Sequence, residues 1–167
     1  AIHFYSFALL SELLLSGNAI HMRFFQSGAV ELVLCAIKNH HKDARVQRHA
    51  CAVLQRSALD CSLRAAIVQQ GGVELTLLFM QKFPDDADAQ YVACATLCNL
   101  FLHREDSRMV VAQHGGVELI LSAMKSHPNV FHVQQNACTA LWLLAFNNKS
   151  NCQLIVEQGG LELVQDA

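Results

Sequence analysis

The chain has 167 residues, a formal net charge of −2 and a hydrophobic fraction of 53%. A nucleic-acid-binding domain is expected to have an isoelectric point above about 9, so the value of 6.5 argues against a nucleic-acid partner. The apolar-rich stretch FALLSELLLSG is far shorter than the roughly 20 residues of a membrane-spanning helix and contains Glu12, so no membrane span is predicted.

Three sets of residues recur along the chain at a spacing of 43 or 44 positions. They are the glutamate of each VEL or LEL motif (Glu31, Glu74, Glu118, Glu162), a glutamine (Gln47, Gln90, Gln134) and a cysteine (Cys51, Cys94, Cys138). Self-similarity at about 40–47 residues is typical of helical solenoids. The sequence therefore predicts a stack of similar helical units.

The N-terminal part of the stack is predicted to hold a partial repeat over residues 1–18 and a complete repeat over about 19–60. The opening stretch, AIHFYSFALLSELLL, is interpreted as the last helix of a unit. The complete repeat ends in VQRHACAVLQRSA, which places Ala50, Cys51, Leu54 and Ala58 on one face of a helix with 3.6 residues per turn.

The repeat at residues 61–104 shows the plan of a unit. A short segment, SLRAAIVQQ, stops at Gly71-Gly72, where glycine permits the sharp turn that ends a helix. A second helix, VELTLLFMQKF, follows. PDDADAQ then supplies a proline at a helix boundary and acidic residues for the first turn of a third helix. That helix carries an apolar face made by Ala93, Cys94, Leu97, Leu100 and Phe101.

The same plan recurs in the repeat at 105–148 and in a partial repeat at 149–167. The third helix VQQNACTALWLLA again has an Ala-Cys pair, and small side chains there let the helices of successive units approach closely. Neither end has the polar outer face of a capping unit. Residues 1–167 are therefore predicted to be a single array that forms part of a longer chain.

This ordered set of motifs resembles the armadillo-repeat family, which includes β-catenin and importin-α. The resemblance covers essentially the whole chain and lies in the helix ending at GG, the VEL helix, the loop with Pro84 or Pro128 and the VQ..A..AL..LA helix. HEAT repeats are the related alternative, but their units usually have two helices and lack the Gly-Gly junction. The resemblance implies an all-α, right-handed α-solenoid of three-helix repeats whose third helices line a peptide-binding groove.

Importin-α-like units carry a tryptophan and, four residues later, an asparagine that holds the peptide backbone. The corresponding tryptophan positions here are Ala52, Ala95 and Thr139, and the asparagine positions are Arg56, Asn99 and Leu143. Only Asn99 fits this pattern. The missing ladder argues against a nuclear-transport adaptor, which is kept as the third alternative.

A β-catenin-like groove instead uses basic side chains to hold acidic, extended partners. Arg48, His49 and Arg56 could act in this way on one helix, although a simple solvated helix face is the competing interpretation. Further polar and aromatic residues that could reach the groove complete the predicted partner-binding set: Tyr91, Asn99, Gln135, Asn136 and Trp142. Tryptophan and tyrosine are frequent among binding hot spots, yet Trp142 could equally pack on a following unit.

Catalytic, cofactor and metal sites are not predicted. The chain lacks a nucleophile elbow, a phosphate-binding glycine loop and an HExxH motif. His40 and His127 occupy equivalent edges about two units apart, a gap of about 20 Å if adjacent helices lie ~10 Å apart, which one metal ion cannot bridge. The sequence therefore argues against an enzyme and against a small-molecule substrate.

The seven cysteines include no CxxC pair, and no signal peptide is visible in this sequence. Buried thiols in a reducing compartment are expected, which favours the cytoplasm and leaves the nucleus and the cytoskeleton open. The leading functional hypothesis is a non-catalytic scaffold that binds an extended or helical segment of a partner protein along the third-helix groove. The main alternative is an architectural arm of a large multidomain protein or assembly.

Overall fold

The computed structural model describes residue 9, residues 27–102 and residues 105–165. Within these ranges every regular element is an α-helix. The predicted partial repeat at 1–18 and the start of the repeat at 19–60 lie outside the described residues, apart from Leu9. The helices are α3 (Ala29–Asn39), α4 (Ala44–Ser57), α5 (Cys61–Gln69), α6 (Gly72–Lys82), α7 (Ala87–Phe101), α8 (Glu105–Gln113), α9 (Gly116–Ser126), α10 (Phe131–Ala145), α11 (Lys149–Glu157) and α12 (Gly160–Gln165).

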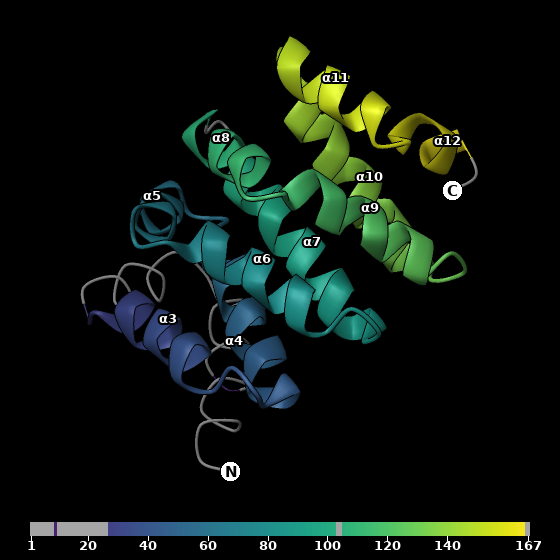
Figure 1. The fold of residues 1–167 in the computed structure, drawn as a ribbon. Coiled ribbons are helices and arrows are strands. Elements are labelled where there is room, and N and C mark those ends of the chain that lie inside the picture. Colours follow the sequence, from purple (N-terminus) through teal and green to yellow (C-terminus); the bar gives the residue numbers. More distant parts are fainter. Residues whose placement is uncertain (1–8, 10–26, 103–104, 166–167) are drawn as a thin grey trace.

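Successive groups of helices stack along one direction, from α3 and α4 at the lower left of Figure 1 to α11 and α12 at the upper right. A short, a medium and a long helix follow one another in α5–α6–α7 and again in α8–α9–α10. The long helix α7 packs against α4 on one side and against α10 on the other. The predicted all-α solenoid of three-helix units is confirmed, while the residue boundaries of the repeats stay a prediction.

The two glycines of each Gly-Gly corner meet different requirements. Gly71 has a φ of 81°, in the left-handed region that side chains with a Cβ rarely adopt. Gly72 starts α6, and a Cβ there would lie 2.8 Å from the carbonyl oxygen of Ile67, besides meeting the Ile67 side chain. The first glycine therefore permits the turn, and the second permits α6 to begin directly against α5.

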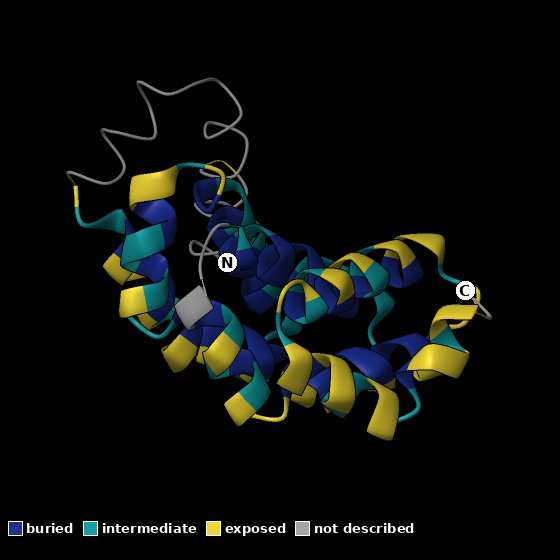
Figure 2. Cartoon of the chain, turned by 90° about the horizontal axis from the view of Figure 1, so that it is seen from above, coloured by how far each residue is buried: buried dark blue, intermediate teal, exposed yellow. Residues whose placement is uncertain are grey.

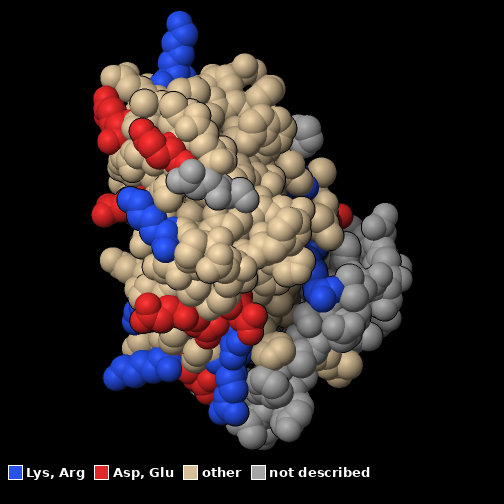
Figure 3. All heavy atoms as spheres, turned by 90° about the vertical axis from the view of Figure 1, so that its right-hand side faces the viewer, with Lys and Arg blue, Asp and Glu red and all other residues tan. Residues whose placement is uncertain are grey.

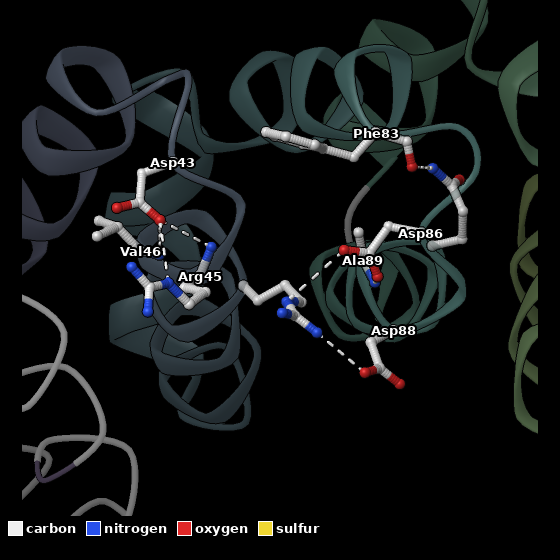
Figure 4. Close-up of polar contacts among 9 residues, drawn as sticks. Asp43, Arg45, Val46, Phe83, Asp86, Asp88 and Ala89 are labelled. Carbon is white, nitrogen blue, oxygen red and sulfur yellow. Dashed lines mark hydrogen bonds and ion pairs between the residues drawn. The ribbon is translucent and has the colours of Figure 1, made fainter.

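Aspartates cap the N-terminal ends of α4, α5 and α7. The carboxylate of Asp43 accepts hydrogen bonds from the backbone N–H groups of Arg45 and Val46, and Asp86 accepts one from Ala89 (Figure 4). These bonds satisfy N–H groups that have no partner within the helix. The bond from Val46 is the largest cause of the lowered pKa of Asp43.

The core lies between the helix layers, with exposed residues on the outer surfaces (Figure 2). Cys51 and Cys94 are fully buried at the contact between long helices, and burial raises the pKa of both thiols. Thr96 on α7 donates a hydrogen bond to the carbonyl oxygen of Cys51 on α4, at 3.3 Å. Because the threonine side chain is short, this bond requires the backbones of α4 and α7 to lie close together, as the recurring Ala-Cys pairs predict. Cys138 is only half-buried.

The recurring glutamine joins the second and third helices of a unit. The side-chain amide of Gln90 donates to the carbonyl oxygens of Met80, at 2.9 Å, and Phe83, at 2.8 Å. Gln134 makes the equivalent bonds to Met124 and His127, both at 2.9 Å. Carbonyl groups at a helix C-terminus lack an intrahelical partner, so the repeat of this glutamine has a structural cause.

Candidate interaction surface

The exposed faces of the long helices α4, α7 and α10 form the surface on which the predicted binding residues lie. Between α4 and α7 the surface is hollowed by a cavity of about 430 Å³, lined by Arg45, Arg48, His49, Asp88, Tyr91 and Val92, among others. The hollow brings together three of the residues selected from the sequence, Arg48, His49 and Tyr91.

Arg48 is held in an ion pair across two helices. Its Nη1 lies 2.9 Å from Asp88 Oδ2, and its Nε lies 3.8 Å from Asp86 Oδ2. Asp86 and Asp88 stand at the start of α7, facing α4 (Figure 4). The guanidinium therefore joins two helices and already has carboxylate partners, which reduces its capacity to attract an acidic ligand.

His49 and Tyr91 form the less polar part of the hollow. Burial, followed by the positive charge of Arg48, lowers the pKa of His49. The ring of Tyr91 contacts the ring of His132 on α10, with centroids 5.7 Å apart, and His132 in turn contacts Phe131 at 5.4 Å. A row of three rings thus extends from the hollow onto α10.

The other predicted residues lie elsewhere on the long helices. Asn99 donates a hydrogen bond to the carbonyl oxygen of Gln55 at 2.8 Å, which ties α7 to α4. Asn136 donates to the carbonyl oxygen of His132 in its own helix. Gln135 is exposed and Arg56 is half-buried. Their role in binding stays a prediction.

Trp142 lies on a second surface, the outer end of the stack. It is 61% exposed and contacts Phe146, with ring centroids 5.8 Å apart. Beside it a cleft of about 250 Å³ runs between α10, α11 and α12, and every residue that lines it is uncharged. We call this surface the end cleft; its walls include Leu141, Trp142, Ile155, Val156, Leu161 and Val164.

Charge is unevenly distributed over the molecule. On the face shown in Figure 3, acidic and basic side chains lie mainly along one margin, and a broad area carries neither. The helix α10 contains no charged residue at all, in contrast to α4 and α7. The surface near the C-terminal end is thus suited to apolar contact.

Sequence reasoning missed Asp88, which lines the hollow, and His132, which contacts Tyr91 beside it. Asp88 appears in the sequence only as a favourable first-turn residue of α7, because the repeat period does not show which residues of adjacent units face each other. His132 sits one residue away from an exposed phenylalanine. No motif marked either residue.

Two further classes of site have no support in the described part of the chain. In the residues that the structure describes, no cluster of three or more His, Cys, Asp or Glu could hold a metal ion. Over the same ranges, no helix is both long enough and apolar enough to cross a bilayer.

Comparison with known proteins places the chain in a family. The family model that describes the H subunit of the V-ATPase matches residues 1–165. The chain belongs to the V-ATPase H-subunit family. No curated protein matches the sequence.

Two solved structures have the same fold as this member of the V-ATPase H-subunit family, and both are crystal structures of engineered proteins from a structural genomics consortium. The first is 21% identical with a TM-score of 0.87, and the alignment covers 99% of this chain and 66% of that one. The second is 25% identical with a TM-score of 0.82, covering 96% and 63%. The chain thus spans somewhat less than two-thirds of the length of each.

The predicted membership of the armadillo family is wrong, because the family that matches is that of the V-ATPase H subunit. The motifs behind that prediction are a glycine corner, small residues between long helices and a period of 43 or 44 residues. Each reflects the geometry of stacking units that contain a short, a medium and a long helix. Such motifs report how a unit packs, and they do not separate one family of helical repeats from another.

Proposed function

We propose that the chain is a non-catalytic, architectural part of a V-ATPase, in which it packs on neighbouring proteins of the assembly. The match to the V-ATPase H-subunit family over residues 1–165 supports membership of such an assembly. In this proposal the partners are proteins, and the domain lies on the cytoplasmic side of the complex. Its seven unpaired cysteines suit a reducing compartment.

The observation that carries this proposal is the family match over residues 1–165, and an exposed apolar surface along α10, α11 and α12 is in keeping with it. Five large apolar side chains are exposed there, by 44% to 61%: Trp142, Phe146, Val156, Leu161 and Val164. Contiguous apolar surface of this kind usually marks an interaction site. Within the stack, by contrast, the residues 44 positions earlier are buried or half-buried.

Incorporation into the complex tests the proposal. The variant Leu161→Glu/Val164→Glu places two charges in the end cleft, and we expect at least a tenfold loss of the chain from purified V-ATPase. The matched control, Leu78→Glu, changes a residue that is 40% exposed on a different helix, and we expect it to incorporate normally. Equal incorporation of both variants would contradict an architectural role for this surface.

A second candidate function is binding of a peptide segment in the hollow between α4 and α7. The 430 Å³ cavity and the row of aromatic rings beside it support this function. Because Arg48 is already paired with Asp88, we expect an apolar or aromatic anchor in the peptide and not an acidic one. If Tyr91→Ala leaves the binding of every partner segment unchanged while Trp142→Ala weakens it, the hollow is not the binding site.

A further inference from the structure

A groove between the second helices α6 and α9 lies on the flank of the stack. Its volume is about 370 Å³, and it is lined by Glu74, Leu78, Gln81, His114, Glu118 and Ser122, among others. We call it the middle groove, because both helices belong to units in the middle of the stack (Figure 1). A further unit of an array of this kind packs on the end of the stack, so it leaves the middle groove uncovered.

The lining of the middle groove is acidic. Glu74 and Glu118 are exposed, and none of the described residues that line the groove is a lysine or an arginine. Gln81 stands where the units before and after have a lysine, since the residues 43 positions earlier and 44 positions later are Lys38 and Lys125. The basic side chain that recurs at this point of the second helix is therefore replaced by a neutral one here.

Glu74 also lacks the hydrogen-bond donor that its counterpart has. Glu31 accepts a hydrogen bond from Nε2 of Gln70 at 2.7 Å, across the boundary between two units. At the next boundary His114 occupies the position of Gln70, and its Nδ1 donates to a backbone carbonyl oxygen of α8 at 2.8 Å. Within the described ranges, Glu74 and Glu118 have no hydrogen bond or ion pair through their carboxylates.

The orientation of Glu118 differs from that of the other glutamates of the repeat. The carboxylates of Glu31, Glu74 and Glu162 turn back toward the glycine that precedes their own helix, with Oε2 3.6 or 3.7 Å from where a Cβ on that glycine would lie. No atom of Glu118 comes within 4 Å of the corresponding point on Gly115. Its carboxylate therefore does not lie against the helix N-terminus, whose positive end stabilises a carboxylate, and it lines the groove together with Glu74.

The apolar part of the groove suits the stem of a long basic side chain. Leu77, Leu78 and Leu119 also line it, and Leu78 is 40% exposed. Lysine and arginine lay their methylene groups along apolar surface and keep the charged end in contact with polar groups or water. Arginine fits best, because its guanidinium carries five N–H donors in one plane and can serve two carboxylates at once.

We infer that the middle groove holds an arginine side chain from another protein of the assembly, with its stem on Leu78 and its guanidinium donating to Glu74 and Glu118. The charge of the groove selects a basic group, and the flank of the stack, unlike its ends, is open to a neighbouring protein and not to a further unit. This inference rests on the architectural role proposed above. Other surfaces, the end cleft among them, also hold the chain in the assembly, so the loss of this one contact leaves incorporation unchanged.

Photocrosslinking in purified V-ATPase tests the inference. Gln81, which is exposed and lines the groove, is replaced by p-benzoylphenylalanine, and the irradiated complex is digested and analysed by mass spectrometry. We expect crosslinks to one segment of a different protein of the complex, within about four residues (~14 Å of extended chain) of an arginine. Crosslinks to the same polypeptide, to a second copy of the chain, or to a segment without an arginine at that distance would overturn the inference.

Charge variants distinguish an ion pair from mere proximity. With the probe in place, Glu74→Gln/Glu118→Gln should reduce the crosslink yield at least tenfold, whereas the matched Glu31→Gln, at the preceding boundary, should change it less than twofold. Glu118→Arg should also abolish the crosslink, and replacing the mapped arginine of the partner by glutamate should restore it, which a purely structural role of Glu118 does not predict. An unchanged yield in the double variant would overturn the inference.

The inference and the architectural role fail in different ways. If the chain incorporates normally but the probe finds no segment that contains an arginine, the inference fails and the architectural role stands. If the chain without any substitution does not occur in purified V-ATPase, both fail.

Discussion

Arg64 on α5 donates a hydrogen bond from Nη1 to the carbonyl oxygen of Leu102, 3.0 Å away and 38 residues later in the chain. Its Nε donates to the carbonyl oxygen of Ala58 at 2.7 Å. One buried guanidinium thus joins the C-terminal ends of α4 and α7. Arg108, in the next unit, donates from Nη1 to the carbonyl oxygens of Leu143 and Phe146 at the C-terminal end of α10, both at 3.2 Å.

Replacing this arginine should weaken the stack. Arg64 is only 5% exposed, and Arg64→Met would leave buried carbonyl groups without a donor, each at a cost of about 1–3 kcal/mol. We expect the free energy of unfolding in urea to fall by at least about 2 kcal/mol. The control is Arg45→Met, because the Arg45 side chain is 73% exposed; a change within about 0.5 kcal/mol is expected there. Equal losses in both variants would contradict the role of Arg64.

The buried glutamine of each unit should also be essential for stability. Gln90→Met keeps the approximate size of the side chain but removes the donor to Met80 and Phe83, so we expect a loss of about 1–3 kcal/mol in thermal or urea unfolding. Gln135→Met, at an exposed position of α10, serves as the control. A neutral Gln90→Met would show that the recurring glutamine has another role.

The helices and their buried faces could be predicted from the sequence because they depend on local signals. Asp86 caps α7, and Ala93 and Cys94 are buried, as the 3.6-residue period and the PDDAD loop predict. The contacts of Arg48 and Arg64 could not be predicted. These contacts join residues about 40 positions apart in the chain. Such pairs depend on the angle by which each unit is rotated relative to the preceding unit, and the spacing of motifs does not reveal that angle.

The two glycines of a corner should respond differently to asparagine. Gly71→Ala should cost about 1–2 kcal/mol because of the left-handed backbone, and Gly71→Asn should cost less, since asparagine tolerates that region. At Gly72 the obstacle is the nearby Ile67 carbonyl, so alanine and asparagine should both destabilise the fold. If asparagine rescued Gly72 as well as Gly71, the steric explanation for Gly72 would be wrong.

Stability should depend on pH through His49. Its folded-state pKa lies below 6.5, mainly because of burial and then because of Arg48, so between these two values the unfolded chain binds more protons than the folded one. The contribution of His49 to the free energy of unfolding is therefore fully present above pH 6.5, and it is lost as the pH falls through the folded-state pKa. When the urea midpoint of unfolding is plotted against pH, the wild type and His49→Gln should have different slopes within that interval. Parallel curves would show that His49 does not contribute.

The candidate surfaces were less predictable than the fold. From the sequence, Trp142 could either reach the groove of the long helices or pack on a following unit, and in the structure it lines the end cleft. The reason is a shift of one residue relative to the asparagine positions, which turns the side chain by about 100° around a helix with 3.6 residues per turn. Small errors of register change which surface a side chain reaches, even when the helix is assigned correctly.

The environment of Trp142 in the assembled complex tests the central claim most directly, because it is the single tryptophan of the chain. The chain is labelled with 5-fluorotryptophan, and its ¹⁹F resonance is recorded in H₂O and D₂O, free and within purified V-ATPase. Architectural packing through the end cleft predicts a solvent-dependent shift for the free chain that disappears on assembly. A shift of the same size in both states would mean that the end cleft stays open to water and does not join the chain to its neighbours.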